Sequence, residues 1–434
     1  NIGTLVSYDS RKGSMASSKN LEIIIEDGKI KEIGRNLNSA DDFYDCKNKL
    51  LTPGFVDCHT HPVFFDDRHR EFKMRVDGLS YDEIAKNGGG INNSISSLRS
   101  SSEINLKNRI QTRMDNFLNL GTTTIEAKSG YGLDLDSELK SLKVLNDLQS
   151  THLIDIVPTF MGAHAIPVEY KKKPDEYVNY LCKVVIPEIA KQGIAEFNDV
   201  FCEEGYFNLE QTKRVLEKGC EYGLTPKIHA DEFKNIGGSS LAGILKCVSA
   251  DHLMKINDED IAHMLESNVT AVLLPGTTFF LGEKDYAPYE KLKNAGLDVA
   301  IATDYNPGSC NIQSMIFIIM LSVLYLKMEI SEALYSSTYI PAKVLNRHET
   351  SGSIEVGKFA NFTAVNKNPL MVKNREIKDI KINTPVYFNQ TSSSSGLDSL
   401  TNNSIEYLFQ DLSLIHISEP TRRYAISYAV FCLK

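Results

Sequence analysis

The sequence predicts an α/β protein, specifically a (β/α)8 TIM barrel with a small β-sandwich-like subdomain formed from both ends of the chain. Between Leu51 and Leu345, eight apolar segments alternate with stretches of helical pattern. These segments are apolar along their whole length, which is typical of parallel strands buried on both faces. Eight such strands separated by helices match the (β/α)8 barrel. Short β-like segments with glycine turns flank this region and predict the second, smaller unit.

The first fifty residues contain short β-like segments, among them LEIIIEDGKIKEIG, in which Asp27 and Gly28 predict a tight hairpin turn. Strand-like sequence resumes in SGSIEVGKFANFTAV, after Ala342. We expect these two regions to pair. The predicted domains are residues 1–50 with 346–390 for the β-subdomain, 51–345 for the barrel, and 391–434 for a tail.

Both ends of the chain look atypical. The sequence starts at Asn1 without Met and its first segment already alternates as a strand, so we expect the N-terminus to be incomplete. The pattern fades after about residue 370, and a serine run covers Ser392 to Ser395. From Leu412 onward the residues resemble translated sequencing adapter. We therefore predict that 391–434 is an atypical low-complexity tail that is not native family sequence, and leave it out of the fold prediction.

Polar residues gather where the predicted barrel strands end. The eight strand segments are, in order, LLTPGFVDCHTH, TTTIEAKSG, LIDIVPTFMGAH, AEFNDVFCE, TPKIHADE, CVSADHL, AVLLPGTTF and DVAIATDYN. Active sites of such barrels lie at the carboxyl ends of the strands. Five of the ten histidines stand there, namely His59, His61, His164, His229 and His252. This concentration predicts the position of an active site.

His59 and His61 are two residues apart on a strand, so both rings point to the same side. Taken alone, such a pair could also pack in the core or lie on the surface. His229 and Asp304 follow later strands, and three neutral imidazoles with one carboxylate form a ligand set suited to zinc or iron, with room for a water. The sequence therefore predicts a metal centre.

Seven motifs resemble the metal-dependent amidohydrolase superfamily and, within it, the imidazolonepropionase family. They are HTHPVFFDDR (59–68), NGGGI (87–91), GTTTIEAKSGYGL (121–133), GAHAIPVEY (162–170), HADEF (229–233), ADHL (250–253) and DYNPGSC (304–310). This resemblance runs through nearly the whole barrel. It implies hydrolysis of the cyclic amide bond of 4-imidazolone-5-propanoate to N-formimidoyl-L-glutamate, a step of histidine degradation.

The same resemblance implies a role for each matching residue. The implied ligands of one zinc or iron ion are His59, His61, His229 and Asp304. The residues implied to contact substrate or product are Arg68, Tyr131, His164, Glu232, Asn306, Gly308 and Ser309. The implied catalytic residues are Glu232, His252 and Asp304; Glu232 would transfer the proton and His252 would lie beside the reacting carbonyl.

One metal is expected rather than two. Binuclear members of the superfamily use a carboxylated lysine at the end of the fourth strand, where this chain has Cys202, Glu203 and Glu204. Lys128, at the end of the second strand, is the one nearby strand-end lysine. For Lys128, a role in the site and a salt bridge to Glu126 or Glu203 are both consistent with the sequence.

Composition limits the partners. The 434 residues include 47 Lys plus Arg against 56 Asp plus Glu, so the formal charge is −9. This balance favours a small-molecule substrate over nucleic acid or an anionic membrane. The eight cysteines form no C-x-x-C pair, and no signal peptide is recognisable. The longest apolar run (residues 315–326) falls well below the ~20 residues of a membrane span. We therefore expect a cytoplasmic protein; a homodimer is compatible with the sequence.

Two alternative functions remain open at this point. Another amidohydrolase-type cyclic amidase, or an aminohydrolase that deaminates a ring, would use the same scaffold. A positively charged anchor at Arg68 would then have no carboxylate to hold. A catalytically inactive binding relative is the other alternative, but such proteins usually lose metal ligands, and the four expected ligands are present.

Overall fold

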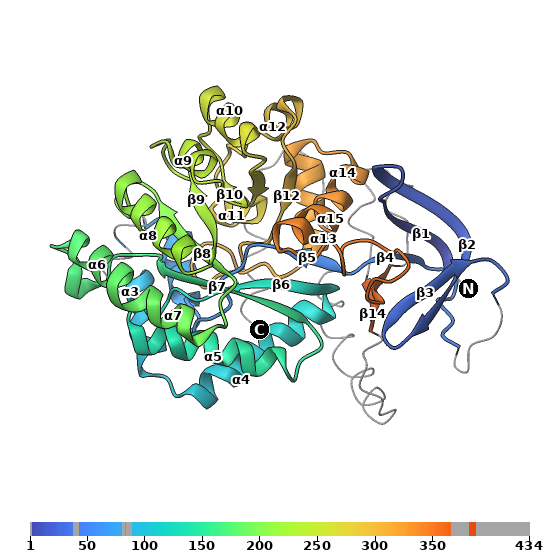
Figure 1. Cartoon of the computed structure of the whole chain (residues 1–434), viewed down its shortest axis with the longest axis horizontal. Helices are drawn as coiled ribbons and strands as arrows, with labels where there is room; N and C mark the ends of the chain where they lie inside the picture. Colours follow the sequence, from blue (N-terminus) through green and yellow to red (C-terminus); the bar gives the residue numbers. More distant parts are fainter. Residues whose placement is uncertain (1, 38–42, 80–82, 84–88, 366–381, 388–434) are drawn as a thin grey trace. The chain divides into compact units, whose positions relative to one another are not determined.

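The computed structural model describes residues 2–37, 43–79, 83, 89–365 and 382–387. Within these residues an eight-stranded parallel sheet has its strands in chain order, as in a (β/α)8 barrel (Figure 1). The strands are β5 (Phe55–Asp57), β6 (Thr122–Lys128), β7 (Asp155–Ala163), β8 (Phe197–Cys202), β9 (Thr225–Ala230), β10 (Ser249–His252), β11 (Thr270–Leu273) and β12 (Val299–Ile301). Seven of them lie within the predicted segments and β11 begins one residue before its segment, so the predicted fold class is confirmed.

The first and last barrel strands meet at their carboxyl ends. The amide of His61 donates to the carbonyl of Tyr305 at 2.8 Å, and the amide of Asp304 donates to the carbonyl of His59 at 3.0 Å. Within the two strands, Val56 and Ile301 instead donate to the carbonyls of Ser337 and Ser336. The barrel is therefore closed by direct pairing at the end where the histidines stand.

Helices connect and cover the barrel strands (Figure 1). They are α1 (His69–Val76), α3 (Ile91–Ser100), α4 (Glu103–Asn119), α5 (Leu135–Gln149), α6 (Pro174–Tyr180), α7 (Ile186–Gln192), α8 (Leu209–Glu221), α9 (Gly238–Ile244), α10 (Asp258–Glu266), α11 (Pro275–Leu281), α12 (Tyr289–Ala295), α13 (Met315–Leu321), α14 (Ile330–Tyr335) and α15 (Tyr339–Val344), with the short η1 (Val168–Tyr170), η2 (Leu181–Val185) and η3 (Ser322–Leu326). Asn208 begins α8 with a capping box, because its side chain accepts from the Gln211 amide and the Gln211 side chain accepts from the Asn208 amide.

The longest apolar run forms α13 and η3, whose inner faces are buried against the barrel core. It is therefore a core helix, as its length predicts. Among the helices of the described residues, none combines the length and the apolar character needed to cross a membrane.

Strands from both ends of the chain form the smaller sheet, as predicted (Figure 1). Its order is β14 (Ile382–Tyr387), β13 (Asn361–Val365), β4 (Leu50–Pro53), β1 (Ile2–Asp9), β2 (Ser14–Glu26) and β3 (Lys29–Gly34). Asp27 and Gly28 both have positive φ, so the predicted hairpin turn between β2 and β3 is present. Ile30 donates to the Lys358 carbonyl and accepts from the Gly357 amide, so β3 folds back over a core that includes Leu5, Leu51 and Phe362.

Gly54 joins this sheet to the barrel. It lies between β4 and β5, and a Cβ atom there would overlap with the side chain of Thr123. Only glycine lets the chain pass from one sheet into the other this close to β6. The predicted tail, 391–434, lies outside the described residues.

Candidate metal centre and active site

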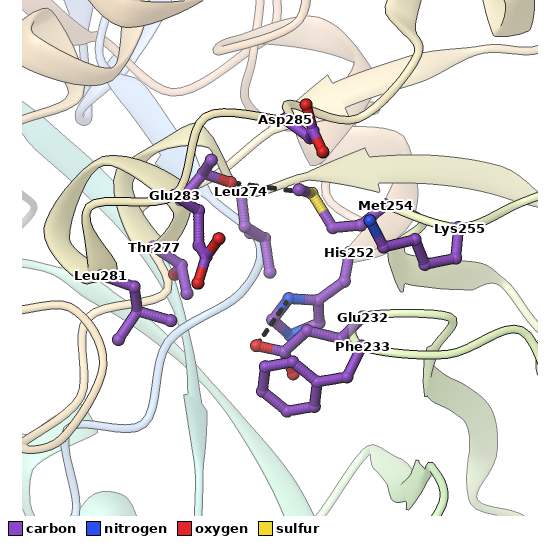
Figure 2. Close-up of a pocket in the computed structure, with 11 residues that line it drawn as sticks. Glu232, Phe233, His252, Met254, Lys255, Leu274, Thr277, Leu281, Glu283 and Asp285 are labelled. Atoms are coloured by element: carbon purple, nitrogen blue, oxygen red, sulfur yellow. Dashed lines mark hydrogen bonds and ion pairs between the residues drawn. The ribbon is translucent and has the colours of Figure 1, made fainter. Parts of the chain in front are cut away.

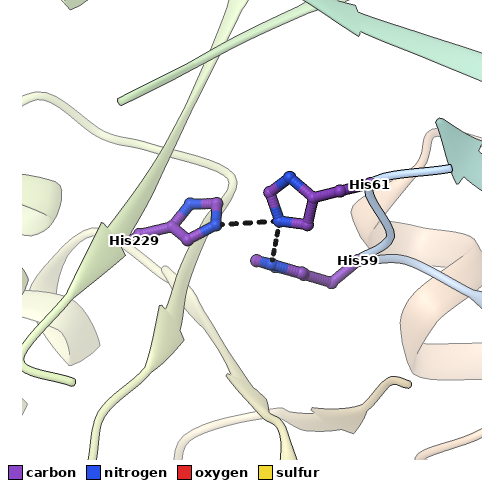
Figure 3. Close-up of side chains that lie close together, drawn as sticks. All are labelled: His59, His61 and His229. Carbon is purple, nitrogen blue, oxygen red and sulfur yellow. Dashed lines mark hydrogen bonds between the residues drawn. The ribbon is translucent and has the colours of Figure 1, made fainter. Parts of the chain in front are cut away.

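Three histidines from two barrel strands point at one another at the carboxyl end of the barrel (Figure 3). His59 and His61 directly follow β5, and His229 lies in β9. The Nε2 atom of His61 lies 3.2 Å from the Nε2 atoms of both His59 and His229. Asp304, after β12, places its Oδ1 atom 3.5 Å from Nε2 of His59 and of His61. The structure thus brings the four expected ligands together.

The donor set fits a metal ion. Nδ1 of His59 contacts Asp251 at 2.6 Å and Nδ1 of His229 contacts Asp199 at 3.1 Å, so the ring proton of each belongs on Nδ1. Burial, reinforced by neighbouring positive groups, lowers the pKa of His59 and of His61 well below 6.5. The rings are therefore neutral, and the Nε2 lone pairs of His59 and His229 point toward Nε2 of His61, 3.2 Å from each. Neutral imidazole is the form that binds metals, so these three nitrogens can serve as ligands of one cation.

The surroundings of Asp304 leave one of its carboxylate oxygens facing the histidines. Its Oδ2 atom accepts a hydrogen bond from Thr277 at 2.5 Å, which leaves Oδ1 facing the histidines. Burial raises its pKa to about 6, and a bound cation would lower that pKa again. Its backbone has φ 53°, a left-handed conformation that costs an aspartate about 1–3 kcal/mol.

His252 has the same kind of strained backbone, with φ 82° at the end of β10. Its Nδ1 atom lies 3.6 Å from Oε1 of Glu232 (Figure 2). Burial raises the pKa of Glu232 well above its ordinary value and lowers the pKa of His252 well below it. A carboxyl group of this kind can hold a proton near neutral pH, as a proton-transfer group must. Both side chains line a cavity of about 230 Å³, together with Phe233, Met254 and Leu274.

Arg68 is buried directly before α1 and forms a two-point ion pair with Glu71. Its Nε and Nη2 atoms lie 2.9 Å and 2.6 Å from the two carboxylate oxygens. The same carboxylate accepts the amide of Gly90 at 2.8 Å, which ties the glycine-rich loop to the arginine. A Cβ atom on Gly308 would overlap with Nη1 of Arg68, so the DYNPGS turn packs directly on the guanidinium. Of the NGGGI motif, Asn87 and Gly88 lie outside the described residues.

Tyr131 and His164 stand beside the histidine cluster. The ring of His164 stacks on that of His61 with 5.0 Å between centroids, and the ring of Tyr131 meets His164 edge-on at 5.0 Å. Burial lowers the pKa of His164 to about 3, so this ring is neutral. Glu138 holds the loop that carries Tyr131, because its carboxylate accepts the amides of Gly132 and Leu133 at 2.9 Å each.

Asn306 bonds to its own turn. Its amide nitrogen donates to the Asp304 carbonyl at 2.7 Å and to Oγ of Ser309 at 2.8 Å. Its amide oxygen accepts from the backbone amides of Gly308 and Ser309 at 2.8 and 2.7 Å. In this geometry Asn306 shapes the turn against Arg68, and contact with substrate would require some of these bonds to open.

Lys128 forms ion pairs, one of the two alternatives left open by the sequence. Its Nζ atom lies 2.7 Å from Glu126 and 2.7 Å from Asp199. Glu203, the other predicted partner, instead accepts the backbone amides of Phe233 and Lys234. The salt bridge to Glu126 is therefore present and that to Glu203 is replaced by Asp199.

Sequence reasoning missed four carboxylates that hold these groups: Glu71, Glu138, Asp199 and Asp251. Two of them had usable signals. Glu71 follows Arg68 at the three-residue spacing that pairs side chains on a helix. Asp199 sits in a strand buried on both faces, where a charge needs a specific partner.

Known proteins resemble this chain in sequence and in fold. Residues 50–395 match the model of the amidohydrolase family. An imidazolonepropionase of Geobacillus sp. (strain WCH70) is 46% identical over 352 residues, which cover 79% of this chain and 83% of that protein. An imidazolonepropionase of Bacteroides fragilis (strain ATCC 25285) is 42% identical over 380 residues, 85% of this chain and 91% of that protein. The chain belongs to the imidazolonepropionase family of amidohydrolases.

Membership of this family makes the protein a hydrolase, and the family together with the histidine cluster indicates a divalent metal ion. Solved structures agree on the fold. The 5-methylcytosine deaminase from Klebsiella pneumoniae liganded with phosphonocytosine superposes with a TM-score of 0.67 over 88% of this chain and 96% of that chain, at 13% identity.

Proposed function

We propose that this chain hydrolyses the cyclic amide bond of 4-imidazolone-5-propanoate to N-formimidoyl-L-glutamate, with one zinc or iron ion per chain. Relatives that match this chain over most of their length, at 42% and 46% identity, are named imidazolonepropionase. The observation that carries the chemistry is the convergence of three buried Nε2 atoms, two of which, those of His59 and His61, lie 3.5 Å from Oδ1 of Asp304. The ring of His252 lies 5.5 Å from that of His59 and 5.3 Å from that of His229, measured between centroids, and Glu232 lies beside His252. These two side chains would supply the groups that a hydrolysis needs.

His59, His61, His229 and Asp304 would hold the ion. When bound, a divalent ion makes water acidic enough to ionise near neutral pH and polarises a carbonyl oxygen as a Lewis acid. A single ion is proposed because the end of β8 offers Cys202 and Glu203 where a bridging lysine would stand, and Glu203 is already bonded to backbone amides. The ligand set suits zinc and iron alike.

Glu232 is proposed as the proton carrier. Its carboxylate takes the proton of the attacking water and delivers it to the ring nitrogen that leaves when the C–N bond breaks. The buried, raised-pKa carboxyl can hold that proton between the two steps. His252, whose Nδ1 atom lies 3.6 Å from Oε1 of Glu232, would stabilise the negative charge that develops on the carbonyl oxygen.

Arg68 is proposed to bind the propionate arm, because a guanidinium matches a carboxylate with two parallel hydrogen bonds. Glu71 fixes the plane of this guanidinium, and the turn of Asn306, Gly308 and Ser309 packs against it. Tyr131 and His164, stacked beside His61, would contact the imidazolone ring. These contacts select an anionic substrate, which a ring deaminase acting on neutral bases would not need.

Incubating the purified chain with 4-imidazolone-5-propanoate and following both substrate loss and product mass tests the proposal. Cytosine, guanine and adenosine serve as control substrates, with release of ammonia as the readout. Formation of N-formimidoyl-L-glutamate without ammonia release supports the proposal. Ammonia release from a base, with the imidazolone untouched, would assign the site to a deaminase.

A further inference from the structure

A buried network of charged side chains lies inside the barrel beneath the histidines. Its members are Glu126, Lys128, Asp199, Lys227 and Asp251, and each side chain is 0% exposed. Isolated buried charges are costly, and even well-packed ion pairs rarely stabilise a core more than apolar residues of the same size. A network of five in the centre of the barrel therefore calls for a role beyond stability.

One carboxylate oxygen of Glu126 joins the two lysines of the network. Oε2 of Glu126 accepts from Nζ of Lys128 at 2.7 Å and from Nζ of Lys227 at 2.9 Å. The other oxygen, Oε1, accepts from the Thr159 hydroxyl at 2.6 Å. Glu126 is thus fixed at both oxygens and holds two lysines at defined positions.

From Glu126 the contacts continue along two arms, and each arm ends on Nδ1 of a proposed metal ligand. In the first arm, Lys128 contacts Asp199 at 2.7 Å, and Asp199 contacts Nδ1 of His229 at 3.1 Å.

In the second arm, Lys227 donates to the backbone carbonyl of Cys58 at 2.8 Å and lies 3.8 Å from Asp251. Asp251 in turn contacts Nδ1 of His59 at 2.6 Å. The second arm therefore holds His59 through its ring and through the residue before it.

We propose that Glu126 is a positioning residue that sets the ring orientation and donor strength of His59 and His229 through Lys128, Lys227 and the two aspartates. This inference rests on the metal centre of the proposed function. A carboxylate on the Nδ1 proton fixes the ring and raises its strength as a ligand. The lysines determine where those carboxylates lie, and Glu126 determines where the lysines lie. His61 contacts none of these five side chains in the hydrogen bonds of the described residues, so the network acts on two of the three rings.

The first test uses Glu126→Gln, which preserves size, in the full chain loaded with cobalt(II). Competition with a chelator measures metal affinity without any substrate, and the visible absorption spectrum of cobalt(II) reports ligand geometry. We expect affinity to fall about 10- to 100-fold, the range for losses of groups behind metal ligands, and the absorption bands to shift. An unchanged affinity and spectrum in a folded variant would overturn the proposal.

Arg347→Met is the matched control. Arg347 forms a partly exposed ion-pair cluster with Glu196 (2.6 Å) and Asp155 (3.2 Å), at the amino ends of the strands and away from the histidines. This variant should lose stability while its cobalt(II) affinity and spectrum stay at wild-type values. Equal spectral changes in both variants would mean that any loss of barrel ion pairs disturbs the site, and the specific role of Glu126 would be refuted.

The second test asks whether Lys128→Met strengthens or weakens the binding of cobalt(II). Removing a positive charge near a dication should tighten binding if charge alone mattered. If Lys128 positions Asp199, binding should weaken instead. Tighter binding contradicts the proposal; if this variant does not fold, the spectrum of Glu126→Gln decides. None of these measurements uses the imidazolone, so they remain valid even if the chain does not hydrolyse that compound. A wild-type chain that binds no cobalt(II) would refute the metal centre itself.

Discussion

Replacing Arg68 by methionine separates recognition of the propionate arm from the chemistry at the metal centre. The guanidinium side chain is 5% exposed and is paired at 2.9 and 2.6 Å with Glu71. Loss of a charge-assisted, two-point contact with the substrate carboxylate should cost about 1.5–3 kcal/mol. At 1.4 kcal/mol per factor of ten, this corresponds to a roughly 10- to 150-fold fall in kcat/KM. If the arm is held equally in the ground and transition states, the fall should appear in KM.

The substitution also leaves the Glu71 carboxylate without its cation. Breaking a buried pair from one side typically costs about 3–5 kcal/mol of stability, although the Gly90 amide still bonds this carboxylate. The double variant Arg68→Met, Glu71→Gln removes that unpaired charge. It should regain thermal stability relative to the single variant and still bind the substrate poorly. Arg68→Lys should recover only part of the binding, since an ammonium lacks the planar fork.

Steady-state kinetics with two compounds decide whether Arg68 binds the propionate arm. The full substrate is compared with an imidazolone that lacks the propionate arm. Wild-type enzyme should process the armless compound poorly, and Arg68→Met should change that rate little. An equal penalty on both compounds would show that Arg68 is structural and would remove the main support for propionate recognition.

Three further outcomes are expected. Glu232→Gln keeps the shape of the side chain but not the base, so kcat should fall by about 10²–10⁴ with metal content intact in elemental analysis; nearly unchanged turnover would shift the proton carrier to another group. Gly308→Ala should raise KM for the full substrate, since its Cβ would overlap with Nη1 of Arg68, while the armless compound is processed as before; an equal effect on both would locate the damage at the metal centre. Burial raises the pKa of Glu355, but hydrogen bonds from Ser10 and Ser353 outweigh it and lower the pKa to about 2. A carboxylate with a lowered pKa stabilises the fold above its unfolded pKa of about 4.5 and loses this contribution as the pH falls toward 2. Urea unfolding should therefore show Glu355→Gln less stable than wild type at pH 6 and nearly equal near pH 2; a constant difference would contradict the lowered pKa.

The barrel could be predicted because its strands are apolar on both faces and therefore stand out as continuous runs. Strand ends converge in such a barrel, so placing His59, His61, His229 and Asp304 at strand ends was sufficient to predict that they form one cluster. That inference needs only the order of the strands. It does not depend on side-chain conformations.

The positions of the carboxylates that contact the histidine ligands depend on finer geometry. Asp199 and Asp251 lie in strands next to that of His229, and the stagger between strands decides which carboxylate meets which ring. Asn306 is predicted to contact substrate, and its amide also fits the tight turn of its own segment, a geometry that residue types alone do not specify. For Lys128, the sequence left two roles open because the position of Asp199 relative to it was unknown.

Activity measured against metal content is the most direct test of the central claim. Chelator-treated enzyme is titrated with zinc or iron(II), and the rate of 4-imidazolone-5-propanoate hydrolysis is recorded at each step. The three-histidine, one-aspartate centre predicts no activity without metal and a linear rise that ends at about one ion per chain. Full activity in metal-free enzyme, or a rise that ends at two tightly bound ions per chain, would contradict it.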